Sequence, residues 1–306
     1  SRCRAVTDLF RLDLSRPQLG KRLASGDQIR GSMTIYDLHC HSTASDGVLS
    51  PAEVVSRAHE KGVHVLALTD HDTIAGLTEA RQQADALGLR LINGVEISTD
   101  WEGKNIHIVG LNFDQTHPKL TALLCHQAEL REKRAVEIGL KVEKLGIVGA
   151  YAGAKQFTDG EVTRAHYARF LVENGIVTNM NQAFKRYLSQ GQSCYVKTDW
   201  VNIPTAIETI HAAGGKAVLA HPLRYTLTNR RMRKLIGEFA QWGGDGLEAA
   251  GCGQTRDQRQ LLARWALEAN LKVSVGSDFH FPCAWIELGR VLTVADCCQP
   301  IWQDFA

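Results

Sequence analysis

The sequence lacks any long apolar run. No stretch approaches the roughly 20 consecutive apolar residues that a helix needs to cross a bilayer, so no membrane-spanning helix is predicted. With 306 residues, of which 44% are hydrophobic and 22% charged, the chain has the composition of an ordinary globular protein. It is long enough to bury a substantial core, in one large domain or two.

The sequence also lacks cysteine pairs at the spacing of a structural zinc site. The eight cysteines include no C-x-x-C pair, which argues against a structural zinc knuckle. Their spacing does not resemble a disulfide framework, and no secretory signal is recognisable. We therefore expect a cytoplasmic protein with reduced thiols.

The net charge is small, and it is unevenly distributed. The value of +2 arises from residues 1–32, which hold seven Arg or Lys and three Asp, whereas the remainder is slightly acidic. A slightly acidic chain is not expected to bind long duplexes. Gly31-Ser32-Met33 resembles a tag junction followed by a start methionine, so we expect residues 1–32 to be a tag-like or disordered leader. A transit peptide is the alternative, which the three Asp residues fit poorly.

Helix-start signals and apolar runs alternate along the chain. Ser50-Pro51-Ala52-Glu53 predicts a capping box, with Ser at the N-cap, Pro at the first helical position and Glu at the third. The following apolar run predicts a strand, and the same order of helix and strand recurs twice later. The strand candidates are residues 35–38, 63–68, 89–92, 106–113, 216–220, 246–249, 272–275 and 289–294.

This alternation predicts an α/β fold. About seven parallel βα units favour a closed or nearly closed barrel over an open sheet, and we assign this barrel to residues 33–115 and 192–306. Residues 116–191 show helical periodicity without a strong strand, so we expect a helical insertion that forms a lid domain over the barrel mouth. In such barrels the chemistry collects at the C-terminal ends of the strands.

Metal-ligand residues occur at these strand ends. His39 and His41 close an apolar run at a spacing of two, so both imidazoles point the same way in a strand, whereas Cys40 should face away. Further clusters follow at Asp46, Thr69-Asp70-His71-Asp72, Glu96, His107, His221 and Asp278-Phe279-His280. Imidazoles and carboxylates without a thiolate suit Mn²⁺, Zn²⁺ or Fe²⁺.

Such a set predicts a site for two or three divalent ions. Two ions about 3.5–4 Å apart can hold a bridging hydroxide and stabilise an in-line phosphoryl displacement. The predicted chemistry is therefore hydrolysis, with a phosphate ester as the substrate. Taken singly, each histidine could instead be a satisfied core or surface residue, and His107, inside an apolar alternation, is the weakest candidate.

The chain resembles the PHP (polymerase and histidinol phosphatase) superfamily in five motifs: D-L-H-C-H-S, T-D-H-D, G-V-E-I-S, A-H-P and G-S-D-F-H. The resemblance covers residues 34–115 and 192–295, and it implies a distorted (β/α)7 barrel. It also implies nine metal ligands, namely His39, His41, Asp46, His71, Glu96, His107, His221, Asp278 and His280. Asp70 resembles a partner that orients a ligand.

Within the superfamily, the insertion and its Thr163-Arg164-Ala165-His166 run resemble bacterial phosphoesterases that act on nucleoside 3′,5′-bisphosphates. This resemblance implies that Arg164 and His166 bind the second phosphate, with Lys197 and Arg224 as secondary candidates. The expected reaction removes the 3′-phosphate from pAp to give AMP, and Mn²⁺ is the favoured ion.

Three alternatives remain open. A 5′-to-3′ exoribonuclease on short 5′-phosphorylated RNA and a histidinol-phosphate phosphatase would use the same fold and metals. The third is an inactive metal-binding module, which a complete ligand set argues against. The expected partner is a small nucleotide or a short single-stranded RNA, with no membrane and no obligate protein partner.

Overall fold

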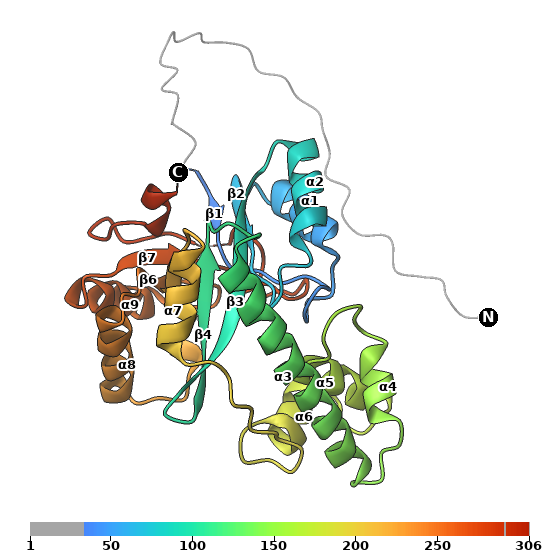
Figure 1. Ribbon diagram of the computed structural model, residues 1–306. Helices are drawn as coiled ribbons and strands as arrows, with labels where there is room; N and C mark the ends of the chain where they lie inside the picture. The colour runs from blue at the N-terminus through green and yellow to red at the C-terminus, as the bar shows by residue number, and fades with distance from the viewer. Residues whose placement is uncertain (1–33, 291, 306) are drawn as a thin grey trace, which may run out of the picture. The chain divides into compact units, whose positions relative to one another are not determined.

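The computed structural model describes residues 34–290 and 292–305 (Figure 1). The expected leader, residues 1–32, lies outside this part of the chain. Among the helices that the structure describes, none is long and apolar enough to cross a membrane.

Seven strands of the described chain form one sheet, and each strand pairs with its neighbours in sequence order. They are β1 (Tyr36–Asp37), β2 (Val65–Leu68), β3 (Arg90–Trp101), β4 (Lys104–Leu111), β5 (Lys216–Leu219), β6 (Gly246–Ala250) and β7 (Lys272–Val275). The two ends of the sheet meet, because Leu38 N donates to Val275 O over 3.0 Å and His41 N donates to Phe279 O over 2.8 Å. The nearly closed seven-stranded α/β barrel expected from the sequence is thereby confirmed.

The expectation that all strands run parallel is wrong for β4. This strand pairs antiparallel with both β3 and β5, whereas the other pairs are parallel. Glu102 and Gly103 form the two-residue turn between β3 and β4, with φ of 49° and 73°. Two successive residues with positive φ are the signature of a tight hairpin, which reverses the chain where a βα unit would continue. The strand candidate at 289–294 is also wrong, because its described residues form turns and irregular chain.

Helices surround the sheet and follow it in the order α1 (Pro51–Glu60), α2 (Leu77–Leu87), α3 (Pro118–Glu143), α4 (Ala150–Lys155), α5 (Arg164–Glu173), α6 (Met180–Ala183), α7 (Ile203–Ala212), α8 (Asn229–Gln241) and α9 (Arg256–Glu268). A π-helical segment, η1 (Phe184–Leu188), follows α6, and two 3-10 turns are η2 (Pro222–Arg224) and η3 (Ile301–Asp304). Helix α1 begins with the predicted capping box, in which Glu53 N donates to Ser50 Oγ and Ser50 N donates to Glu53 Oε2. The Ser50 prediction is confirmed.

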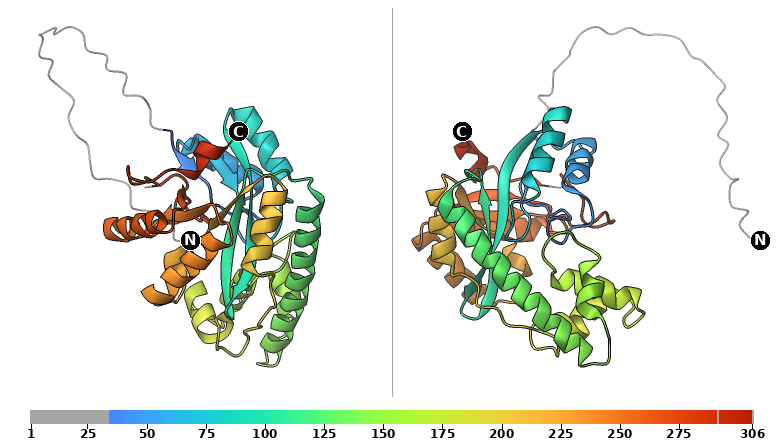
Figure 2. Two further views of the ribbon diagram at one scale, coloured as in Figure 1. Left: turned by 60° about the vertical axis from the view of Figure 1, so that its left-hand side comes forward. Right: turned by 45° about the vertical axis from the view of Figure 1, so that its right-hand side comes forward.

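Helix α3 contributes to two hydrophobic cores. Its first turns place Leu120 and Leu124 in the core that the barrel shares with the helices packed on it. Its later turns place Ile138 and Val142 in a second core with α4 to η1, around Tyr167. Figures 1 and 2 show this long helix leading from the sheet to the group of short helices that follows. Helix α3 is continuous through both cores and so joins the two parts of the chain. A lid domain formed by residues 116–191 stays a prediction.

Candidate metal centre and the adjoining anion pocket

The chain that follows β1 brings two histidines to one point. The Nε2 atoms of His39 and His41 lie 3.2 Å apart, as a spacing of two in extended chain predicts. Cys40 points the other way, where its thiol donates to Ala67 O over 3.3 Å inside the barrel core. The expectation that Cys40 faces away from the histidines is confirmed.

The structure brings all nine predicted ligand residues together. Eight of them form three overlapping groups, in each of which the potential ligand atoms lie within 4.8 Å of one another. The groups are His41, Asp46, His71 and His280; His39, His41, Glu96 and Asp278; and His71, Glu96 and His107. The ninth residue, His221, places its Nε2 atom 2.9 Å from Glu96 Oε1. Their role as ligands stays a prediction that this arrangement supports.

Glu96 lies at the centre of the cluster. One of its oxygens is 2.8 Å from His107 Nδ1, and the other is 2.9 Å from His71 Nδ1 and 3.2 Å from His41 Nε2. The sequence suggested that Glu96 ends a strand, but β3 continues to Trp101. The carboxylate still reaches the barrel mouth, because the pairing with β2 stops at Asn93 and the β3–β4 hairpin projects beyond it.

The polar atoms of this cluster fit a bound cation. Several of them are buried and have no hydrogen-bond partner, namely His41 Nδ1, Asp46 Oδ1, His71 Nδ1, Glu96 Oε2, His221 Nδ1 and Asp278 Oδ1. A buried polar atom without a hydrogen-bond partner is costly, and a cation bound among these side chains would offer such atoms a partner. Burial raises the pKa of Glu96, but the charges of the surrounding histidines outweigh it and hold the pKa well below its usual range. An ionised carboxylate among imidazoles is a suitable ligand set for divalent ions.

Strained backbone also marks the cluster. His221 has φ of 26°, Asp278 has φ of 51° and Asp72, next to His71, has φ of 53°. Positive φ is uncommon for residues other than glycine, and it persists where surrounding contacts hold it. Each of these residues follows a strand that ends at the barrel mouth, so the strain lies where the side chains turn inward.

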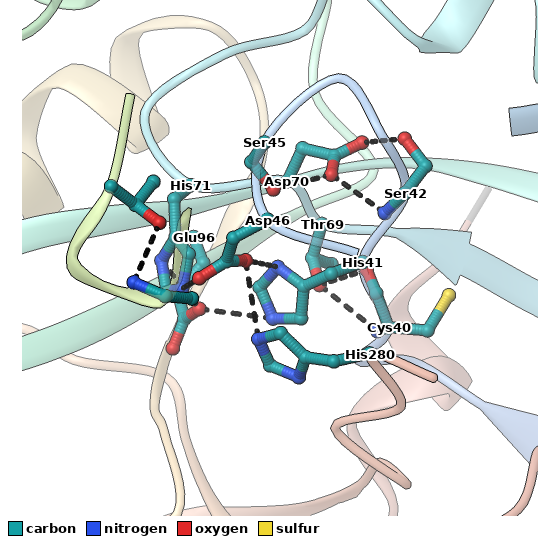
Figure 3. Close-up of polar contacts among 12 residues, drawn as sticks. Cys40, His41, Ser42, Ser45, Asp46, Thr69, Asp70, His71, Glu96 and His280 are labelled. Carbon is teal, nitrogen blue, oxygen red and sulfur yellow. Dashed lines mark hydrogen bonds and ion pairs between the residues drawn. The ribbon is translucent and has the colours of Figure 1, made fainter. Parts of the chain in front are cut away.

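Two carboxylates support the cluster from behind, and Figure 3 shows the first of them, Asp70. Asp70 accepts hydrogen bonds from Ser42 N (2.8 Å), Ser42 Oγ (2.7 Å) and Ser45 Oγ (2.6 Å), and so fixes the loop that carries Asp46. Glu248 in β6 lies 2.7 Å from His39 Nδ1 through its Oε2 atom. Glu248 was not predicted as a site residue, although an acidic residue inside an apolar strand candidate was a usable signal.

A hollow of about 80 Å³ adjoins the cluster. Its walls include Asp46, His71 and His107 on the side of the cluster and Arg131, Arg134 and Arg164 on the other side. We call this hollow the arginine pocket. It places three positive side chains next to the predicted ligands, although sequence reasoning found only Arg164.

The arginines are held in different ways. Arg131 Nε donates to Asp72 Oδ2 over 2.7 Å, and its Nη2 donates to Ser98 Oγ over 2.9 Å. Arg134 stacks over the Trp200 ring and has a buried Nε without a hydrogen-bond partner. Burial lowers the pKa of Arg134 to about 9, and the charges of Arg164 and Arg131 act in the same direction. Positive charge that lacks a counter-charge indicates an anion site.

The other predicted substrate residues do not line the arginine pocket. His166 Nδ1 accepts a hydrogen bond from Thr163 N over 2.9 Å and so caps α5, whereas its Nε2 is buried without a hydrogen-bond partner. Lys197 lines another hollow with Lys133 and Arg134, the last of which also lines the arginine pocket, and its role in substrate binding stays a prediction. Arg224 does reach the cluster, through an ion pair with Asp278.

Comparisons with known proteins agree with this geometry. A family model described as PHP domain matches residues 37–189. A 5′-3′ exoribonuclease of Haemophilus influenzae is 68% identical over 270 residues, which cover 88% of this chain and 98% of that protein. A 3′,5′-nucleoside bisphosphate phosphatase of Chromobacterium violaceum is 39% identical over 275 residues, covering 89% and 96%. The solved structure of an amidohydrolase from Chromobacterium violaceum, with bound sulfate and no metal, aligns with a TM-score of 0.84 at 39% identity, covering 89% and 96%.

Proposed function

Because the chain belongs to the PHP domain family, we propose that it hydrolyses the bond between phosphorus and the 3′ oxygen of a nucleotide that carries a 5′-phosphate. In pAp this reaction consumes water and yields AMP and phosphate. At the 5′ end of a short RNA it yields a mononucleotide and a shorter chain with a new 5′-phosphate. One site can perform both reactions, because the same bond breaks beside the same bound 5′-phosphate.

The 5′-to-3′ exoribonuclease reaction is the better candidate for the natural activity. The exoribonuclease relative is more similar to this chain than the bisphosphate phosphatase relative is. In this proposal pAp is the smallest substrate that fills both halves of the site. An enzyme that consumes nucleotides and short RNA is expected in the cytoplasm.

The observation that carries the proposal is the arginine pocket beside the cluster. A substrate with two anionic groups can place one in the cluster and the other against Arg131, Arg134 and Arg164. Residues 163–165 also line this pocket, and they form the N-cap and the first two positions of α5. The dipole at a helix N-terminus favours a bound phosphate, and here it acts without the N–H groups of Thr163 and Ala165, which donate within the cap.

The proposed roles of the side chains follow from this arrangement. The guanidinium groups of Arg134 and Arg164 bind the 5′-phosphate, and Arg131 holds the pocket wall in place through Asp72. His166 acts on Arg164 through the cap of α5, so it is a positioning residue. Binding of the 5′-phosphate fixes the register, so that the first 3′-phosphate ester reaches the cluster.

We propose that the nine clustered residues hold two or three divalent ions, with Mn²⁺ as the favoured species. When bound, such ions supply positive charge for the phosphoryl oxygens and lower the pKa of water. The side chains of this chain hold the ester in place: the cluster accepts the phosphate, and the arginine pocket keeps the ribose and 5′-phosphate on one side of it. Imidazole and carboxylate ligands without thiolate leave Zn²⁺ and Fe²⁺ as alternatives.

A substrate panel with Mn²⁺ tests the proposal. Products are measured from pAp, AMP, histidinol phosphate, a short 5′-phosphorylated RNA and the same RNA with a 5′-hydroxyl. We expect cleavage of pAp and of the 5′-phosphorylated RNA, release of mononucleotides from the 5′ end, and little reaction with AMP. The RNA with a 5′-hydroxyl should react at least tenfold more slowly, because it leaves the arginine pocket empty.

Two results would contradict the proposal. A preference for histidinol phosphate over pAp would indicate a histidinol-phosphate phosphatase, because that substrate has no second phosphate. Absence of metal binding together with absence of hydrolysis would indicate an inactive module. Equal rates for the two RNAs would retain the phosphoesterase but remove the role of the arginine pocket.

A further inference from the structure

A second hollow borders the cluster. It has a volume of about 140 Å³ and lies where β5, β6 and β7 end and α9 begins. Its lining includes His221, Arg224, Ser277 and the loop at 251–254. We call it the β6 hollow. It shares no lining residue with the arginine pocket.

We propose that the β6 hollow binds the nucleotide that follows the cleaved bond of an RNA substrate. This inference rests on the proposed function and extends it, because pAp has no such nucleotide. The hollow would therefore decide how well the enzyme acts on RNA without affecting the smaller substrate.

One lining residue of each hollow contacts Glu96, which itself lines neither. His107 lines the arginine pocket and His221 lines the β6 hollow, and their nitrogens lie 2.8 Å and 2.9 Å from the same Glu96 oxygen. Arg224 in the β6 hollow also contacts Asp278 of the cluster. A phosphate held by the cluster thus has one hollow beside His107 and another beside His221.

The chemistry of a phosphodiester requires two such spaces. The phosphorus carries two ester oxygens, one from the first ribose and one from the second. With the 5′-phosphate in the arginine pocket, the first ribose occupies that side of the cluster. The second nucleoside must leave toward other space, and the β6 hollow borders the cluster without sharing a wall with the first site.

The lining of the β6 hollow suits a nucleotide. Gln254 Oε1 accepts from Gly251 N over 3.0 Å, and Gln258 Oε1 accepts from Thr255 N over 2.9 Å. Within the described chain neither amide nitrogen has a hydrogen-bond partner, so both can donate to a ribose or a base edge. The Arg224 side chain is about half exposed and can contact a further phosphate as well as Asp278.

The substitutions Gln254→Glu and Gln258→Glu test the inference. Each keeps the accepting oxygen that forms the observed hydrogen bond, so each preserves the local fold while adding a negative charge to the hollow. Gln260→Glu is the matched control, because it adds the same charge to α9 at a residue that does not line the hollow. Thermal unfolding of all three variants checks that they remain folded.

The measured quantity is kcat/KM with Mn²⁺ for pAp and for a 5′-phosphorylated dinucleotide. For Gln254→Glu and Gln258→Glu we expect kcat/KM to fall at least tenfold on the dinucleotide and less than twofold on pAp. For the control Gln260→Glu we expect no change of kcat/KM on either substrate. Equal losses on both substrates, or no loss on either, would overturn the inference and leave the proposed function standing. If the unsubstituted protein cleaves pAp but not the dinucleotide, the inference also fails. If it cleaves neither, the proposed function itself fails.

Discussion

Arg131 and Asp72 form a buried ion pair, with Arg131 Nε 2.7 Å from Asp72 Oδ2. Arg131 belongs to α3, and Asp72 follows His71 of the cluster. The other Asp72 oxygen accepts hydrogen bonds from Ser98 N (2.8 Å) and Gln127 Nε2 (3.0 Å). The pair therefore fixes the helix that carries the arginine wall against the loop that carries a predicted ligand.

Substitution of Asp72 by Asn should strongly destabilise the protein. It leaves the Arg131 charge buried without its partner, and breaking a buried pair in this way costs about 3–5 kcal/mol. The free energy of unfolding, measured by urea denaturation, checks this. Glu208→Gln is the control, because the Lys119–Glu208 pair is exposed on both sides and should contribute less than about 1 kcal/mol. If the two substitutions lower the free energy of unfolding by similar amounts, Asp72 does not hold α3 against the loop that carries His71.

The pH dependence of stability should report on His166. Burial lowers the pKa of His166 to about 4 in the folded protein, whereas an unfolded histidine has a pKa of about 6.5. Between these values the unfolded chain binds the extra proton, so the stability contribution is complete above pH 6.5 and declines as the pH falls toward 4. At pH 5.5 the loss relative to pH 8 is about 1.4 kcal/mol.

The substitution His166→Gln isolates this contribution. Glutamine at the same helical position can accept the hydrogen bond from Thr163 N, but it does not titrate. The difference in unfolding free energy between the two proteins should therefore change by about 1.4 kcal/mol between pH 8 and pH 5.5. Other titrating groups cancel in this difference. A difference that stays constant with pH would show that His166 titrates normally.

The metal cluster was predictable because of the barrel topology. Parallel strands bring their C-terminal ends to one mouth, so residues far apart in sequence, such as His41 and His280, could be assigned to one place. Glu96 and His107 were assigned to that place for a partly mistaken reason, since they lie within a hairpin that reverses the chain. The Glu102-Gly103 turn was the available signal for this reversal.

The anion-binding wall was less predictable. Arg131 and Arg134 lie in a helix with charged residues on several faces, and the sequence does not say which face a long helix turns toward the barrel. The orientation depends on packing of Leu120 and Leu124 against the barrel core at one end of α3. Arg164 was found because the Thr163-Arg164-Ala165-His166 run resembles that of the bisphosphate phosphoesterases. His166 belongs to the same motif, but it is used to form the cap.

The arginine pocket should discriminate between substrates. Arg134→Ala and Arg164→Ala each remove a guanidinium expected to bind the 5′-phosphate, and a hydrogen bond to a charged group contributes about 1.5–3 kcal/mol. We expect kcat/KM for pAp to fall about 10- to 150-fold, and the value for a simple aryl phosphate to change less than about threefold. Lys185→Ala, an exposed change in η1, should affect neither substrate. Equal losses on both substrates would show that the arginines do not bind the second phosphate.

Metal affinity should depend on Glu248, which contacts the cluster only through His39. Its Oε2 atom lies 2.7 Å from His39 Nδ1, so it orients the ring and leaves the other ring nitrogen facing Glu96 and Asp278. Loss of such a supporting carboxylate typically weakens metal affinity about 10- to 100-fold. Glu248→Gln should therefore shift the Mn²⁺ titration of chelator-treated protein by this factor, and excess Mn²⁺ should restore hydrolysis. Glu268→Gln, on the exposed end of α9, serves as the control for a change of charge alone. Unchanged Mn²⁺ affinity in Glu248→Gln would show that the barrel, rather than this contact, orients His39.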